Sequence, residues 1–150
     1  MRVFKSLEEF TAAEGEALGV SEWVRIDQEK IDRFAEATGD CQWVHTDPVK
    51  AASGPFGRTI AHGYLTVSLV SQLLSDIYSV EGLTLGINYG ADAVRFPSPV
   101  LVDSRIRATA SLAAATPKGS AVQARIDVTV EIEGAEKPAC VLQAIFVFAA

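Results

Sequence analysis

The spacing of apolar residues divides the chain into a helical first half and a strand-like second half. In the first half, apolar residues recur every three or four positions, which is the period of a helix with one buried face. This pattern predicts helices over Ser6–Leu18 and Gln28–Thr38, and a short helix from Pro48 that ends before Gly54. Between the first two helices, Glu22–Ile26 has the composition of a short strand.

Residues suited to helix ends support these assignments. Ser6, Asp27 and Asp47 each stand where a side-chain oxygen can accept a hydrogen bond from the first helical turn. Gly19 and Gly39 stand where the first two helices should stop, because glycine readily takes the left-handed conformation of a helix end.

One helix should be buried on most of its surface. Over Gly63–Tyr78 the apolar residues fall almost all round the helix, and the interruptions at Thr66, Ser68 and Ser71 are small. A helix of this kind belongs in the centre of a protein.

The second half predicts an antiparallel sheet. Apolar and polar residues alternate over 105–112 and 124–132, as in strands with one buried face, and turn-forming residues at 116–119 and 133–136 suggest hairpins. Residues 140–148 are apolar at nearly every position, which predicts a central strand covered on both faces. The fold class is therefore α+β, with a curved sheet wrapped around the central helix. The hot dog fold has this arrangement, although other α+β sandwiches share the pattern.

Composition limits the function. The 150 residues suit a single domain over 1–150, with 49% hydrophobic and 21% charged residues. The formal net charge of −6 argues against non-specific binding to nucleic acid, and the apolar helix is too short and too polar to span a membrane. The N-terminus lacks the apolar run of a signal peptide, and Cys41 and Cys140 are too few for a disulfide scaffold. We expect a cytoplasmic protein.

Candidate chemistry gathers before the central helix. Asp40 and His45 share a short irregular segment, and the other histidine, His62, directly precedes the helix. A carboxylate and an imidazole placed in this way can act together on a small molecule such as water. Each residue also has a structural alternative: Asp40 as a turn cap, His45 as a hydrogen-bonded loop histidine, and His62 as a helix cap or hydrogen-bond donor. Asp40, His45 and Asp47 form only a weak metal-binding pattern, and we expect no metal.

Gly63 offers a different kind of group. The first N–H groups of a helix have no acceptor within the helix, and the helix dipole favours negative charge there. A ligand carbonyl that gains enolate character would be stabilised at such a position, and a glycine allows close approach.

Three sequence blocks resemble the MaoC-like dehydratases, the (R)-specific enoyl-CoA hydratases. Residues 37–48 read Ala-Thr-Gly-Asp-Cys-Gln-Trp-Val-His-Thr-Asp-Pro, residues 57–63 read Gly-Arg-Thr-Ile-Ala-His-Gly, and residues 94–100 read Val-Arg-Phe-Pro-Ser-Pro-Val. The blocks occur in the order and spacing of that family. Gln42-Trp43 replaces the family's usual Asn-Pro and is similar to the nodulation protein N-like branch.

The resemblance implies a hot dog fold and a homodimer with a continuous sheet. It also implies a lyase of fatty acid metabolism that adds water to a trans-2-enoyl-CoA to give an (R)-3-hydroxyacyl-CoA. Asp40 and His45 would then activate the water, and the Gly63 N–H would bind the thioester oxygen. No metal or redox cofactor would be needed.

The same resemblance suggests residues that bind the substrate. Gln42 would orient water or substrate, Ser71 would border the acyl tunnel, and Arg58 and Arg95 would meet the phosphates of CoA, with a structural ion pair as their alternative. His62 joins these candidates, with the structural roles given above still open.

Three other functions are compatible with this reading. A 3-hydroxyacyl dehydratase specific for acyl carrier protein would act only on carrier-linked substrates. A hot dog acyl-CoA thioesterase would release a free thiol from a saturated acyl-CoA, although its motifs usually lack the Asp40–His45 pair. A non-catalytic module that binds acyl thioesters would not need that pair.

Overall fold

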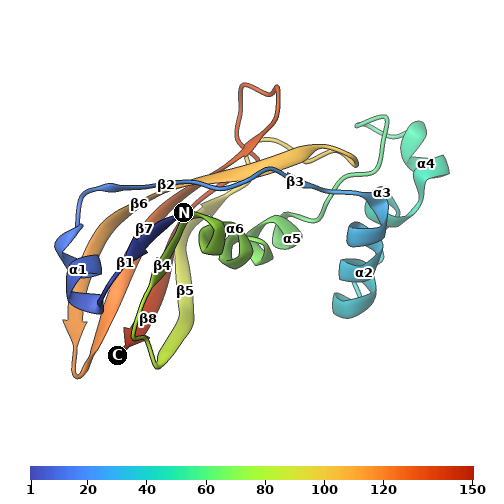
Figure 1. The fold of residues 1–150 in the computed structure, drawn as a ribbon. Helices are drawn as coiled ribbons and strands as arrows, with labels where there is room; N and C mark the ends of the chain where they lie inside the picture. Colours follow the sequence, from blue (N-terminus) through green and yellow to red (C-terminus); the bar gives the residue numbers. More distant parts are fainter.

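An antiparallel sheet forms the largest part of the computed structural model, which describes residues 1–150 (Figure 1). The strand order is β2-β6-β7-β8-β5, and β3 pairs with β6 as well. The strands are β2 (Ala17–Val20), β3 (Val24–Arg25), β5 (Leu85–Arg95), β6 (Arg105–Lys118), β7 (Ala121–Ile132) and β8 (Cys140–Ala149). A separate parallel pair consists of β1 (Arg2–Phe4) and β4 (Tyr78–Val80). The predicted hairpins join β6 to β7 and β7 to β8.

The predicted alternation of buried and wet residues is confirmed in β6 and β7. Ile106, Ala108, Ala110 and Leu112 are buried in β6, while Arg107, Thr109 and Ser111, which alternate with them, are partly exposed, and β7 repeats this pattern over 124–132. The buried residues of both strands join one apolar core with the buried residues of α6 (Val70–Ile77). The prediction of an α+β protein with a sheet packed on the central helix is therefore correct.

Strand β8 lies inside the sheet, between β7 and β5, as predicted. The prediction that both of its faces are covered is wrong. Cys140, Leu142 and Ala144 are buried, whereas Val141 and Gln143 on the other face are half-buried. No second layer covers the outer face of the sheet, so those residues remain in contact with solvent.

The central helix is bent rather than continuous. It divides into α5 (Gly63–Ser68) and α6, with Leu69 between them, and Tyr78 already belongs to β4. The Ser68 hydroxyl donates to the Tyr64 carbonyl oxygen (2.7 Å), a bond of the kind that bends helices. The helical bonding still continues, because the Leu69 N–H donates to Leu65 and the Leu73 N–H donates to Leu69. The two parts act as one bent helix.

The N-terminal helix is shorter than predicted. The element α1 (Leu7–Ala12) ends early, and the Gly15 N–H donates to the Leu112 carbonyl oxygen of β6 (2.7 Å). This bond brings the chain to the sheet edge, where Leu18 is buried as part of β2. The expected helix over 13–18 is thus wrong, and Gly19 lies within β2 instead of ending a helix.

The other helix ends agree with prediction. Asp27 caps α2 (Gln28–Thr38), and Gly39 ends it in the left-handed conformation. Asp47 caps α4 (Pro48–Ala52). The four-residue helix α3 (Trp43–Thr46) was not predicted. Figure 1 shows α2, α3 and α4 together at one end of the molecule, away from α1. No helix is long and apolar enough to cross a membrane.

Candidate active site

The loop between α2 and α3 brings Asp40 towards His45. The left-handed Gly39 ends α2, and Asp40 follows it with its side chain exposed to solvent. The chain then turns directly into α3, where the Thr46 hydroxyl lies 3.2 Å from the carbonyl oxygens of Cys41 and Gln42. These short-range contacts keep the loop tight, so that His45 folds back beside Asp40.

His45 is held in one tautomer. Its side chain is buried, and Nδ1 lies 2.7 Å from the Ile60 carbonyl oxygen. Because a carbonyl oxygen can only accept, Nδ1 carries the proton, and in the neutral ring Nε2 keeps its lone pair. The Ile60 N–H donates to the Val44 carbonyl oxygen (3.1 Å), so the two segments are joined through both backbone and side chain. Nε2 of His45 is therefore available as a base.

His62 supports the loop from the other side. It is only 3% exposed, and its Nε2–H donates to the main-chain oxygen of Asp40 (2.8 Å). Its Nδ1 is buried without a hydrogen-bond partner. His62 occupies the N-cap position of α5, but its side chain makes no capping hydrogen bond. His62 thus contacts the backbone of the site. Of the roles considered from the sequence, it takes that of a structural hydrogen-bond donor.

The three side chains converge. One ligand atom from each of Asp40, His45 and His62 lies within 4.8 Å of the others. The two imidazole rings stack with their centres 3.7 Å apart and their planes 25° apart. A metal ion lies in the plane of the imidazole ring that binds it. Two stacked rings have separate planes, so their lone pairs do not point at one common ion. Asp47, the third member of the weak sequence pattern, is occupied in capping α4. The arrangement therefore suits proton transfer better than metal binding.

The surroundings of His45 keep it neutral. Burial is the largest influence and lowers the pKa of His45 below its usual 6.5, and the neighbouring His62 lowers it further. The Ile60 carbonyl and the Asp40 carboxylate oppose this shift. At neutral pH the Nε2 lone pair is consequently free to accept a proton.

Gly63 begins α5 directly after His62, as predicted. As the first residue of the helix, it has an N–H with no acceptor inside the helix. A side-chain carbon at Gly63 would lie only 3.0 Å from the ring of Phe96, so glycine is required for this close approach. Both residues line a cavity of about 310 Å³ that also contains Phe56 and Thr66.

The remaining predicted residues lie further from this cluster. Gln42 is exposed, and only its main-chain oxygen is hydrogen-bonded, to α3. Ser71 is exposed and lines a different cavity of about 420 Å³, beside β4, β5 and β8. Arg58 and Arg95 are exposed and form no ion pair, while seven of the thirteen Lys and Arg side chains do.

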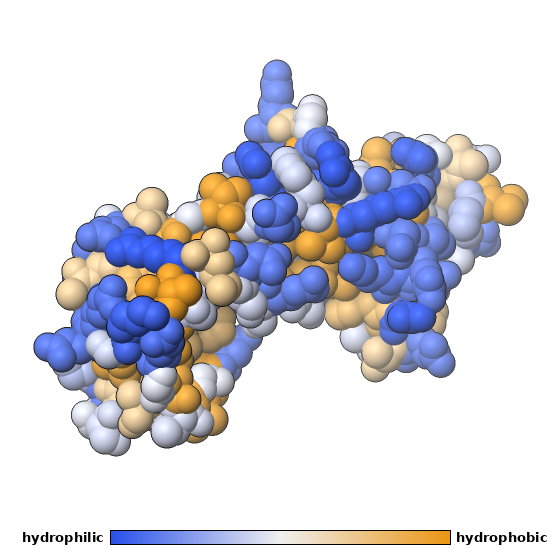
Figure 2. Space-filling model, viewed as in Figure 1, coloured by the Kyte–Doolittle hydropathy of each residue, from blue (hydrophilic) through white to orange (hydrophobic).

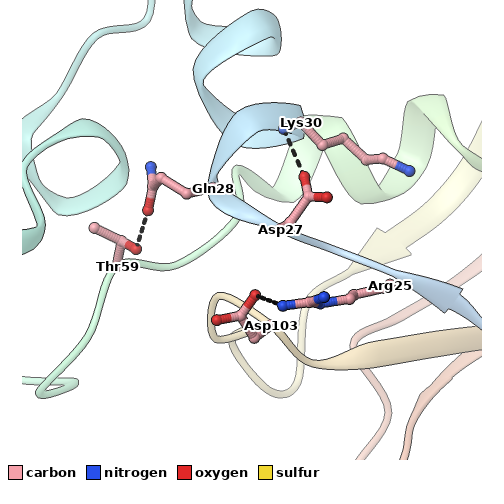
Figure 3. A network of polar contacts seen from close by, with 6 residues as sticks. All are labelled: Arg25, Asp27, Gln28, Lys30, Thr59 and Asp103. Carbon is pink, nitrogen blue, oxygen red and sulfur yellow. Dashed lines mark hydrogen bonds and ion pairs between the residues drawn. The ribbon is translucent and has the colours of Figure 1, made fainter.

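A polar network that the sequence did not reveal joins α2 to both site segments, and Figure 3 shows one of its bonds, between Gln28 and Thr59. The Gln28 amide donates to the His45 carbonyl oxygen (2.7 Å) and accepts from the Thr59 hydroxyl (2.6 Å). Gln28 lies at the start of a predicted helix, where a polar residue does not by itself indicate a functional role. Thr59 lies inside the block 57–63, and a hydroxyl beside the apolar pair Ile60-Ala61 was the signal available.

The chain belongs to the MaoC-like domain family. The family model described as MaoC like domain matches residues 9–134, which is most of the chain. This match confirms the resemblance of the three sequence blocks to that family.

Individual relatives agree with this placement. The 3-hydroxyacyl-thioester dehydratase Z of Mycobacterium tuberculosis is 53% identical over 146 residues, which cover 97% of each chain. Nodulation protein N of Rhizobium leguminosarum bv. viciae is 45% identical and covers 89% of this chain and 85% of its own. The solved R-hydratase PhaJ1 from Pseudomonas aeruginosa matches with a TM-score of 0.69 and 25% identity, over 89% of this chain and 79% of that chain. The hot dog fold and the similarity to nodulation protein N are confirmed.

Proposed function

We propose that the protein is a 3-hydroxyacyl-thioester dehydratase, a hydro-lyase that interconverts trans-2-enoyl and (R)-3-hydroxyacyl thioesters. The observation that carries this proposal is the convergence of Asp40 and His45 with His62, the residue directly before the helix start at Gly63, while Ile60 holds Nδ1 of His45. The similarity to a dehydratase over nearly the whole chain supports it.

In the hydration direction, the proposed reaction uses Asp40, His45 and the Gly63 N–H. Nε2 of His45 accepts a proton from water while the water oxygen bonds to C3 of the enoyl thioester. The C2–C3 π electrons move toward the thioester oxygen, and the Gly63 N–H stabilises the charge that develops there. The Asp40 carboxylate accepts the other water hydrogen as a hydrogen bond and orients the water. The proton then returns from the Asp40–His45 pair to C2, so that the product has gained one water.

The thioester would reach this site through the cavity beside Gly63. The cavity is lined by apolar residues such as Phe56 and Phe96, which suit an acyl or pantetheine chain. Arg58 and Arg95 lie within two residues of these aromatic residues in sequence and have no carboxylate partner. We assign them to the phosphate groups of the carrier, with CoA as the carrier.

A homodimer is part of the proposal. Strand β5 ends the sheet, nearly all of its residues are exposed, and its outer edge has no partner. A row of α6 side chains, Ser71, Gln72 and Ser75, is also exposed. The outline is hollowed below α5 and α6, between the sheet end and the α2–α4 end (Figures 1 and 2). A second copy paired along β5 would extend the sheet and cover the helix, and Ser71 would then border the acyl path. The two free thiols fit a cytoplasmic location.

Hydration of crotonyl-CoA, followed by the loss of enoyl absorbance, tests the proposal. We expect Asp40→Asn and His45→Gln each to lower kcat/KM by about 10²–10⁴, the usual contribution of a positioned acid or base. Asp127→Asn is the matched control, because Asp127 is exposed on β7 and contacts Gln143 away from the site. Absence of turnover on short, medium and long enoyl-CoA would refute CoA as the carrier, and further absence on carrier-protein enoyl thioesters would refute the reaction.

A further inference from the structure

We infer that Gln28 is a positioning residue for His45, an inference that rests on the proposed function for its catalytic meaning. Gln28 is the first residue of α2, directly after the cap Asp27 (Figure 3). Its amide nitrogen donates to the His45 carbonyl oxygen (2.7 Å) and to an Asp32 carboxylate oxygen (2.8 Å). Its amide oxygen accepts from Thr59 (2.6 Å). One side chain thus joins three separate segments of the chain.

These bonds close a ring around His45. The His45 ring donates to the carbonyl oxygen of Ile60, and its own carbonyl oxygen is joined through Gln28 to Thr59, the residue before Ile60. The backbone and the ring of His45 are therefore both tied to the same two-residue segment. If either of these connections is lost, the orientation of the imidazole ring depends on the other alone.

The chemistry of the two partners calls for an amide. Helix α3 has only four residues, so the carbonyl of His45 needs a donor from outside the helix. The Thr59 hydroxyl is on a residue that is only 1% exposed, so it needs an acceptor from within the protein. A glutamine supplies both a donor and an acceptor from one group, whereas a carboxylate could only accept.

The network also anchors the site to the sheet. The Thr59 carbonyl oxygen accepts from the Val102 N–H (2.9 Å), in the segment that leads into β6. Through Thr59, Gln28 therefore connects His45 to the sheet. Gln28 itself lies at the start of α2, away from the reacting atoms. A displacement of about 1 Å at a catalytic group can lower a rate about 100-fold.

Two substitutions remove the network from opposite ends. Gln28→Met keeps the length of the side chain and removes the amide, and Thr59→Val keeps the shape and removes the hydroxyl. We expect Gln28→Met to lower kcat about 10- to 100-fold while KM changes little, because Gln28 does not line the cavity proposed for the thioester. Thr59→Val should lower kcat in the same direction and Thr59→Ser should restore it. Gln28→Glu should not restore activity, because its carboxylate cannot donate to His45. Gln123→Met, on β7, is the matched control.

Nitrogen-15 NMR of the imidazole rings of the untagged protein tests positioning without using activity. The chain has only two histidines, so their signals can be assigned by a single His62 variant. We expect neutral His45 to show one protonated Nδ1 in the wild type, and Gln28→Met and Thr59→Val to populate the Nε2-protonated tautomer as well.

The outcomes separate this inference from the proposed function. Unchanged His45 signals in both variants, or a kcat equal to that of Gln123→Met, would overturn the positioning role. If Gln28→Met does not fold, Thr59→Val alone decides by the same two criteria. A wild-type protein that is inactive on every enoyl thioester would refute the proposed function, while the NMR comparison would still decide whether Gln28 holds His45.

Discussion

At the scale of single residues, His45 and His62 have divided roles although they are stacked. Each gives one ring N–H to a main-chain oxygen, His45 to Ile60 and His62 to Asp40. His62 is almost fully buried and holds the loop that carries Asp40 through this bond, whereas His45 keeps its Nε2 free of hydrogen bonds to the protein. Close stacking also means that a charge on one ring disfavours a charge on the other.

The lowered pKa of His45 predicts the acid side of the activity profile. Burial disfavours the imidazolium, and so His45 should stay an effective base as the pH falls through 6.5, its usual pKa. We expect kcat/KM for hydration to fall only below that pH, since kcat/KM reports the free enzyme. The measurement is kcat/KM for crotonyl-CoA between about pH 4.5 and 8.

The same shift has a consequence for stability. Below pH 6.5 the unfolded chain binds a proton at His45 that the folded protein resists, so the free energy of unfolding should decrease as the pH falls from 6.5 toward the lower folded-state pKa. His45→Gln should reduce this dependence in urea titrations. In the activity profile, a fall in kcat/KM centred at or above pH 6.5 in the wild type would contradict the assignment of His45 as the base.

At the scale of elements, the start of α5 and the segment after β5 depend on each other. Gly63 begins α5, and Phe96 follows the last residue of β5 with its ring against Gly63. Phe96 is 44% exposed, so its side chain has room to move. Gly63 is not among the residues with positive φ, so its backbone conformation does not require a glycine. The glycine is needed because the ring of Phe96 leaves no space for a side chain.

Gly63→Ala tests this packing. The added methyl group would push the Phe96 ring and crowd the N–H proposed to bind the thioester oxygen, so we expect kcat/KM to fall about 10²- to 10³-fold, the usual effect of losing one such donor. The melting temperature should change little, since alanine is a good helix former. Gly63→Ala with Phe96→Ala should recover part of the rate, with Phe96→Ala alone as the control. Equal rates for Gly63→Ala and the wild type would contradict a role for this N–H.

Elements that depend on local signals were predictable from the sequence. Helix α2 was predicted at its true bounds because Asp27 and Gly39 mark both ends within the local sequence. Helix α1 was overextended because the bond from Gly15 to Leu112 joins residues far apart in the chain, and no local pattern reveals it. The parallel pair β1–β4 was missed for the same reason.

The candidate site was predictable only in part. The motif placed Asp40, His45 and Gly63 within about 25 residues of each other, and the structure brings Asp40 and His45 together beside His62, which precedes Gly63. The stacking of the two histidines and the bridge from Gln28 arise from tertiary packing. Periodicity reports which face of an element is buried, but it does not report which polar groups meet across elements.

At the scale of the whole molecule, the exposed edge strand is the feature that a single copy leaves unexplained. Strand β5 is 11 residues long and pairs on one side only, with β8. Leu85, Ile87 and Tyr89 are exposed by 53%, 44% and 60%. A long edge strand with apolar side chains is prone to pair with another chain unless charges, proline or a covering segment block it. The pairing of β5 with β8 shifts register between Asn88 and Gly90, but the middle of β5 carries no charge, proline or covering segment, which favours association along β5.

Ile87→Lys tests that association. In a dimer paired along β5, a lysine at position 87 of each strand would put a charge among the exposed apolar side chains of the edge and weaken the pairing. We expect the wild type to have twice the 16.0 kDa mass of one chain in light scattering after gel filtration, and Ile87→Lys to have the mass of one chain. Hydration activity should be lost together with the dimer if the second copy completes the acyl path beside Ser71.

Val20→Lys is the matched control, because Val20 is a similarly exposed apolar residue on the opposite edge strand, β2. A dimer that persists in Ile87→Lys, or one that Val20→Lys dissociates instead, would show that the copies do not meet along β5.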